Sequence, residues 1–331
     1  MSHPVLGQDS IPTTSGFSGF ALAGPGYFNV ETNLIVSGSP LLDDVGNIRI
    51  DSIFAPPPSQ TAPALLLAGE LNYTFASTRT QLYFGNRLED ILRLDIAVSL
   101  GVRQELPDEG ILSASLLTTP LDLKVWLDPY IEGEDRTRTE LDFPGVRLRW
   151  AKILKTGLEL TATARNYRHD EEKSGDWLVS QGRLAPNQQL LLDRDGDIVT
   201  LQALYRIDGK QHRFEPAVRY VNDNHDGAAL AKKGYALQLT YLFRSPKVVL
   251  DANVLYGTRK ANAIHPIYGK ILETDRWGAA LTAFIPVKAF KSSRLSVFVT
   301  AEIFREDANI DFYDAKVSSL SAGLVWRHSR P

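Results

Sequence analysis

Apolar and polar residues alternate along most of this chain with a period of two. The alternation is clearest between residues 92 and 102, where the apolar positions are Leu92, Leu94, Ile96, Val98, Leu100 and Val102. Charged or small residues stand between them. Successive side chains of a β-strand point to opposite faces, so this segment predicts a strand with one apolar and one polar face. Because the pattern recurs through the chain, it predicts a transmembrane β-barrel with lipid outside and water inside.

The alternation and the turn residues together predict an all-β, antiparallel, up-and-down barrel of fourteen strands. We place the strands at residues 17–30, 65–76, 80–85, 91–105, 111–126, 143–154, 157–168, 198–207, 212–221, 234–244, 247–258, 276–287, 294–305 and 317–327. Twelve strands is the alternative, in which the third and fifth segments do not count.

The connections between these segments alternate in length. The short ones are residues 77–79, 107–110, 155–156, 208–210, 245–246 and 288–293, and the long ones are 31–64, 131–142, 169–197, 222–233, 259–275 and 306–316. The connection 86–90 is short where a long one is due. Outer-membrane barrels have short periplasmic turns and long outer loops. We therefore expect one domain over 1–331, with 1–16 as a periplasmic N-terminal segment and 31–64 as the first outer loop.

Composition narrows the class further. The chain has no cysteine, which excludes disulfides and thiolate metal sites, and its net charge of −3 gives no reason to expect nucleic acid as a partner. No apolar run reaches the length of a membrane-spanning helix. The first residues, MSHPVLGQDS, lack the charged and apolar regions of a signal peptide. We expect a mature form from which the signal has been removed.

The face opposite the apolar one carries an excess of positive charge. From their positions in the two-residue alternation, the arginines expected to face the lumen are Arg93, Arg103, Arg147, Arg149, Arg165, Arg206, Arg213, Arg219, Arg244, Arg276 and Arg294. The inward acids are Glu70, Asp95, Glu159, Glu215, Asp251 and Glu302. Either these charges pair across strands and brace the wall, or the arginines line a pore that favours anions. A barrel of fourteen strands has a lumen wide enough for either.

The first long loop is unusually apolar for a solvent-facing segment. In one interpretation it packs into the barrel mouth and its end belongs to the second strand. In the other it is a docking site for a hydrophobic or amphipathic ligand. The candidate contacts are Ile53, Phe54, Leu65 and Leu66.

Two clusters of Asp, Asn and Gly resemble the start of calcium-binding loops, at residues 193–197 and 222–227. Both are incomplete, since the twelve-position count from Asn222 ends on Lys233 where a glutamate is needed. Turn chemistry explains them equally well. The six histidines form no metal-spaced pair, and no catalytic motif accompanies those in the outer loops. We expect no enzyme activity and no cofactor, with calcium at the outer loops left open.

Several strings along the chain resemble a family of uncharacterised proteobacterial outer-membrane proteins, catalogued only as a domain of unknown function. They include TQLYFGN at 80–86, WLDPY at 126–130, LDRDGD at 192–197, PIYGK at 266–270 and NIDFYD at 309–314. The resemblance implies an outer-membrane barrel. It brings no catalytic or binding residues to carry over.

We therefore expect a porin-like channel in the outer membrane of a Gram-negative bacterium, for passive diffusion of small solutes and with anions favoured. Uptake of a hydrophobic or amphipathic, lipid-like molecule through the first outer loop is one alternative. A closed structural or adhesive surface barrel is another. The expected partners are outer-membrane lipids and lipopolysaccharide, the barrel assembly machinery, and the small solute or amphiphile.

Overall fold

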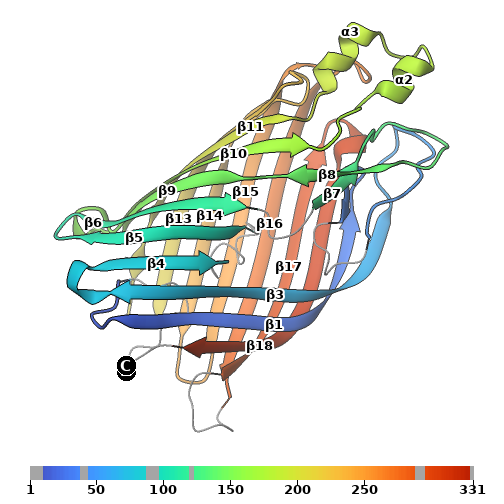
Figure 1. Ribbon diagram of the computed structural model, residues 1–331. Coiled ribbons are helices and arrows are strands. Elements are labelled where there is room, and N and C mark those ends of the chain that lie inside the picture. The colour runs from blue at the N-terminus through green and yellow to red at the C-terminus, as the bar shows by residue number, and fades with distance from the viewer. Residues whose placement is uncertain (1–9, 38–43, 87–96, 119–122, 288–294, 329–331) are drawn as a thin grey trace.

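A computed structural model describes residues 10–37, 44–86, 97–118, 123–287 and 295–328. In these residues, fourteen long antiparallel strands form one closed barrel (Figure 1). Strand β1 (Gly16–Glu31) pairs with β3 (Ser59–Phe75) on one side and with β18 (Ala315–His328) on the other. The pairing of the first and last strands closes the sheet. The predicted fold and strand count are confirmed, and the alternative of twelve strands is wrong.

Each remaining wall strand pairs with its neighbours in chain order. These strands are β4 (Thr80–Gly85), β5 (Val98–Leu106), β6 (Gly110–Thr118), β9 (Gly145–Ala151), β10 (Leu158–His169), β11 (Gly196–Tyr205), β13 (His212–His225), β14 (Lys232–Arg244), β15 (Val249–Ile264), β16 (Ile271–Pro286) and β17 (Leu295–Ala308). The two-residue β12 (Ile207–Asp208) continues β11 along β13.

Three short strands lie apart from the main barrel wall. Strands β2 (Ile35–Ser37), β7 (Leu123–Trp126) and β8 (Arg138–Asp142) form a second sheet that joins the end of β10. The predicted fifth strand, 111–126, is therefore wrong over residues 123–126, which form β7, while residues 119–122 lie outside the described part of the chain. Val125 and Trp126 are both buried, so the last part of that segment breaks the alternation of a barrel strand. The predicted segment 91–96 lies outside the described residues.

The first outer loop is shorter than predicted. β1 ends at Glu31 and β3 begins at Ser59, so the loop covers residues 32–58. Ser59, Gln60 and Thr61 look like loop residues in the sequence, yet they pair with the end of β1.

The N-terminal segment lies at the opposite end of the barrel from this loop. There, Arg79 donates a hydrogen bond to the carbonyl of Pro12 at 2.7 Å. The N-terminal segment thus contacts the short-turn end of the barrel.

The outer face of the barrel is apolar in the predicted phase. Leu148, Leu237 and Leu320 are 61%, 65% and 60% exposed and point away from the lumen. The predicted outward residues Leu160, Leu239, Val254 and Tyr256 are also exposed. Near the strand ends, the exposed aromatic residues are Phe75, Tyr205, Trp277 and Trp326. An apolar band with aromatic residues at its borders is the surface that a bilayer requires.

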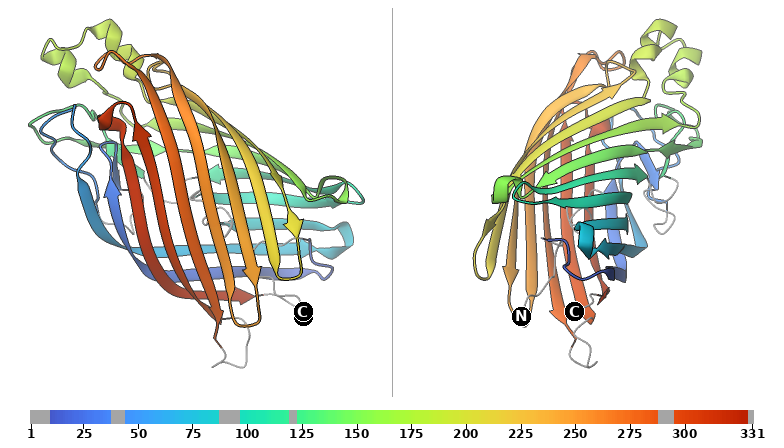
Figure 2. Two further views of the ribbon diagram at one scale, coloured as in Figure 1. Left: turned by 180° about the vertical axis from the view of Figure 1, so that it is seen from behind. Right: turned by 60° about the vertical axis from the view of Figure 1, so that its left-hand side comes forward.

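Both described α-helices lie at one end of the barrel, in one long connection. The connection from β10 to β11 contains α2 (Asp176–Ser180), α3 (Pro186–Gln189) and a 3-10 turn, η3 (Leu190–Leu192). Figure 2 shows α2 and α3 opposite the turn between β14 and β15. Further 3-10 turns are η1 (Ala76–Thr78), η2 (Ile153–Lys155) and η4 (Asp311–Tyr313). None of the helices in the described residues is long and apolar enough to cross a membrane.

Candidate functional site

The long loops pack together over the outer mouth of the barrel. Their buried side chains form one apolar cluster, which we name the outer cap: Ile50, Ile53, Tyr130, Leu178, Leu184, Leu192, Leu230, Ala261, Leu272, Ile310, Phe312 and Tyr313. They come from the β1–β3, β6–β9, β10–β11, β13–β14 and β17–β18 connections and from the outer ends of β15 and β16. Since these elements are spread around the barrel, the cap covers the mouth.

The centre of the outer cap holds a buried chain of hydrogen bonds. The Tyr313 hydroxyl lies 2.6 Å from His265 Nε2 and 2.5 Å from the Tyr130 hydroxyl. The backbone N–H of Ile267 donates to His265 Nδ1, so the neutral ring carries its proton on Nε2 and donates to Tyr313. Burial lowers the pKa of His265 to about 3 and raises the pKa of both tyrosines. All three groups are therefore uncharged at neutral pH.

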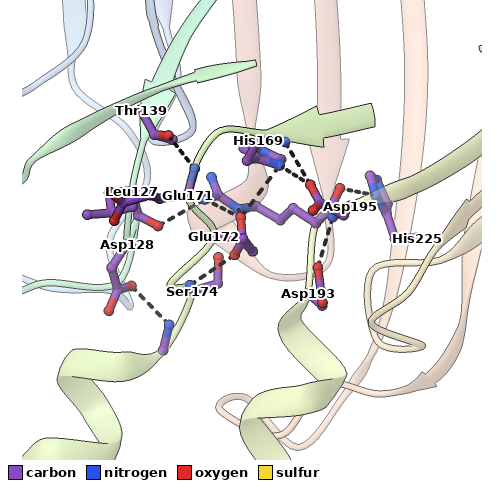
Figure 3. Close-up of polar contacts among 12 residues, drawn as sticks. Leu127, Asp128, Thr139, His169, Glu171, Glu172, Ser174, Asp193, Asp195 and His225 are labelled. Atoms are coloured by element: carbon purple, nitrogen blue, oxygen red, sulfur yellow. Dashed lines mark hydrogen bonds and ion pairs between the residues drawn. The ribbon is translucent and has the colours of Figure 1, made fainter. Parts of the chain in front are cut away.

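A second set of contacts fixes the helical loop on the barrel rim. We name it the polar anchor: His169, Glu172, Arg194, Asp195 and His225 (Figure 3). The Arg194 guanidinium lies 2.6 Å from Glu172 Oε2, and His169 Nδ1 lies 2.7 Å from Asp195 Oδ1. The His225 ring donates to the Arg194 carbonyl at 2.7 Å. The ends of β10 and β13 are thereby joined to the segment that leads into β11.

Asp128 holds the start of α2. Its carboxylate accepts hydrogen bonds from the backbone N–H groups of Tyr130, Gly175 and Trp177, at 3.0, 3.0 and 2.9 Å. Burial raises the pKa of Asp128, and the three donors oppose that shift. One carboxylate thus ties the β7–β8 connection to the helical loop.

The two calcium-like clusters act as turns that touch each other. Asp193 Oδ1 accepts from the N–H of Asp195 at 3.0 Å, and the Asp193 carbonyl accepts from the N–H of Gly227 at 3.0 Å. Within the part of the chain that the structure describes, no three His, Asp or Glu side chains converge as a metal site requires. Calcium at these loops and the expected lack of enzyme activity stay predictions.

Below the polar anchor lies a cavity of about 550 Å³ inside the barrel. Tyr167, one of its lining residues, packs on the ring of His225 with centroids 5.0 Å apart. Five arginines and a single carboxylate line this lumenal cavity in the described residues: Arg147, Arg165, Arg219, Arg259, Arg276 and Glu159. Phe143, Tyr167 and Phe304 supply aromatic rings to its wall.

The strand register explains why there is space. Arg147 of β9 stands in one row of the sheet with Thr163, Thr200, Val221 and Gly234 of the next strands. Gly234, Ala236 and Gly257 also line the cavity, and each pairs across strands with an arginine: Gly234 with Arg259, Ala236 with Arg219 and Gly257 with Arg276. Because these three positions carry little or no side chain, the long arginine side chains beside them have room in the lumen.

Much of the predicted lumenal charge is paired. Buried contacts join Arg103 to Glu70 at 2.9 Å, Arg149 to Glu159 at 2.5 Å and Arg206 to Glu215 at 2.7 Å, and Arg213 contacts the exposed Asp208 at 2.5 Å. At the cavity, Arg276 contacts Glu306 at 2.8 Å and Arg259 lies 3.7 Å from Asp223. The bracing interpretation fits these pairs, because a buried charge needs a partner.

Three arginines of the lumenal cavity contact uncharged groups. Arg219 donates to Gln202 Oε1 at 2.8 Å, Arg147 donates to Thr163 Oγ1 at 3.2 Å, and Arg165 lies 4.6 Å from the centroid of the Phe143 ring. Among the described residues that line the cavity, five arginines stand against one carboxylate. Arg103, Arg213, Glu215, Asp251 and Glu302 lie elsewhere along the inner face, and Arg93, Asp95 and Arg294 lie outside the described residues.

The structure does not bring the four predicted loop contacts together. Ile53 is fully buried in the outer cap, while Phe54 is 58% exposed beside Tyr268. Leu65 points to the lipid side of β3, and its neighbour Leu66 packs inside the lumen. The period of two requires this separation of adjacent strand residues.

The sequence analysis did not identify the hydrogen-bonded core of the cap or the aromatic residues of the cavity. Tyr130, His265 and Tyr313 lie in or beside three of the strings that carry the family resemblance, WLDPY, PIYGK and NIDFYD. Several aromatic residues in otherwise polar loops are the signal that could have indicated a packed cap.

Comparison with solved structures gives likenesses of fold at low identity. A loop-deletion variant of the outer-membrane protein OmpT of Vibrio cholerae is 10% identical, with 95% of this chain and 99% of that chain covered and a TM-score of 0.42. An anion-selective porin from Comamonas acidovorans is 8% identical, with 95% and 100% covered and a TM-score of 0.39. A Pseudomonas aeruginosa FadL homologue is 9% identical, with 94% and 90% covered and a TM-score of 0.42.

These likenesses carry no information about the solute. No curated protein matches the chain. A family model described as protein of unknown function (DUF2860) matches residues 16–327, which cover the barrel from β1 to the last residues of β18. The chain therefore belongs to the DUF2860 family of uncharacterised proteins.

Proposed function

We propose that this protein is an outer-membrane channel for small solutes and that the lumenal cavity favours anions. One observation carries the proposal: five arginines and one carboxylate line the cavity in the described residues. A cavity lined by one sign of charge raises the local concentration of ions of the other sign. Rings of arginine or lysine are used in this way in anion pores.

The outer cap sets a condition on transport. Solutes that reach the cavity from outside have to pass an apolar layer built from six groups of loop and strand-end residues. We therefore propose that passage accompanies brief displacements of the cap, and we expect intermittent openings instead of a steady large current.

The proposal is tested by swelling of proteoliposomes that contain the full chain. Solutes of similar size and different charge are compared: gluconate, sorbitol and N-methylglucamine. Faster entry of the anion supports the proposal, and faster entry of the cation contradicts it. Equal exclusion of all three favours the closed structural barrel.

Uptake of an amphipathic molecule is a second candidate, supported by the apolar interior of the outer cap. It predicts that short-chain fatty acids enter faster than gluconate, and that shortening the cap loop within residues 48–58 slows them. The direct channel predicts that the same deletion speeds gluconate, because it weakens the barrier over the cavity.

A further inference from the structure

We propose that the lumenal cavity binds anions that carry a planar aromatic ring, such as simple aromatic carboxylates. The inference deepens the proposed function, since it assigns a ligand class to the same cavity. It rests on how aromatic rings and guanidinium groups are interleaved on the cavity wall.

The first observation is the aromatic wall. Phe143 and Tyr167 stack with ring centroids 4.3 Å apart and an angle of 20° between their planes, and both line the cavity. Phe304 lines it from β17. A pore that selects small inorganic anions by charge needs no such rings. Protein groups cover the faces of Phe143 and Tyr167, since the two rings stack on each other, Arg165 lies over Phe143 and the His225 ring packs on Tyr167. These rings therefore offer a flat ligand their edges, in the edge-to-face contact that aromatic rings favour.

The second observation is that two arginines lie over these rings. Arg165 stands 4.6 Å from the Phe143 centroid and Arg276 stands 4.9 Å from the Phe304 centroid. A guanidinium group is flat, stacks on rings and binds carboxylates through two parallel hydrogen bonds. The same wall can therefore hold the ring of a ligand and its negative group.

The third observation is an additional donor and the size of the space. Gln238 lines the cavity, and its buried Nε2 has no hydrogen-bond partner in the described part of the chain. A volume of about 550 Å³ falls in the range of small-molecule sites. The small residues Gly234, Ala236 and Gly257 alternate with Arg259, Arg219 and Arg276 across neighbouring strands, which leaves space beside these guanidinium groups.

The test is isothermal titration of the detergent-solubilised full chain with three probes. Benzoate has the ring and the charge, cyclohexanecarboxylate has the charge without a planar ring, and benzamide has the ring without the charge. We expect benzoate to bind at least about fivefold more tightly than cyclohexanecarboxylate, and benzamide to bind least. Equal affinities for the two acids would overturn the assignment.

Two variants separate the two parts of the site. Phe304→Leu should lower the affinity for benzoate to that for cyclohexanecarboxylate, and Arg219→Gln should weaken both acids about tenfold. Arg305→Gln is the matched control, because this exposed arginine of β17 does not line the cavity. An unchanged preference in Phe304→Leu would also overturn the assignment.

Titration does not depend on transport, so the two proposals fail separately. If benzoate binds but the barrel excludes every solute, the aromatic-anion site is supported and the channel is contradicted. If gluconate enters but benzoate binds no more tightly than cyclohexanecarboxylate, the channel is supported and the aromatic-anion site is contradicted.

Discussion

His265 Nε2 lies 2.6 Å from the hydroxyl of Tyr313 in the buried centre of the outer cap. The two residues are 48 positions apart and come from different loops. Tyr313 also contacts Tyr130. The hydrogen bonds among these three side chains take the place of the hydrogen bonds that their polar atoms would otherwise make to water. These three side chains therefore satisfy one another's polar atoms inside the apolar cluster.

Removing the Tyr313 hydroxyl tests whether this chain stabilises the cap. Tyr313→Phe leaves His265 and Tyr130 without their shared partner, and we expect the cap to lose about 1–3 kcal/mol. Hydrogen–deuterium exchange of cap amides should speed up, while exchange in the barrel wall stays unchanged. Tyr27→Phe on the lipid face is the control. Equal exchange in both variants would show that packing alone holds the cap.

Acid should loosen the cap through His265. Burial lowers its pKa from 6.5 to about 3, so the folded cap binds fewer protons than the open one between these values. Cap stability then falls as pH drops below 6.5, by up to about 1.4 kcal/mol per pH unit. The groups around the ring, Tyr130, Tyr268 and Tyr313, stay protonated in this range because burial raises the pKa of each.

Exchange rates of cap amides measured between pH 7 and pH 4.5 check this dependence. His265→Gln keeps a donor for Tyr313 and should remove most of the pH dependence. A wild-type cap whose opening is independent of pH would contradict the buried neutral histidine.

Asp128 should control the helical loop. Asp128→Ala removes the acceptor of three backbone N–H groups, and we expect a local loss of about 1–3 kcal/mol in residues 170–195. Limited proteolysis of the variant should cut this loop faster than in the parent. The exposed Asp51→Ala serves as control. Unchanged cleavage would mean that the polar anchor alone fixes the loop.

The Arg149–Glu159 pair should stabilise the barrel wall. Glu159→Gln leaves the Arg149 guanidinium without the carboxylate that it contacts at 2.5 and 2.6 Å, at a cost of about 3–5 kcal/mol. The unfolding temperature, followed by the gel shift of heated barrel, should fall. Arg305→Gln, at an exposed ion pair, should hardly change it. A matching fall in both variants would argue against bracing by buried pairs.

The sequence predicted those features that depend on local alternation. Strand β4 matches its predicted bounds, and the face on which a strand residue such as Arg149 or Glu159 lies follows from its parity. Which charges pair depends on the register between strands, and the sequence alone does not contain it. The cap depends on contacts between distant loops such as those of Tyr130 and Tyr313, for which no periodicity exists.

The most direct test of the central claim is the reversal potential of the full chain in a planar bilayer under a potassium chloride gradient. The arginine-lined cavity predicts a potential of the sign that chloride preference requires, reduced in Arg147→Gln/Arg219→Gln and unchanged in Arg305→Gln. Cation preference, or the same potential in all three proteins, would contradict the claim that the lumenal cavity selects anions.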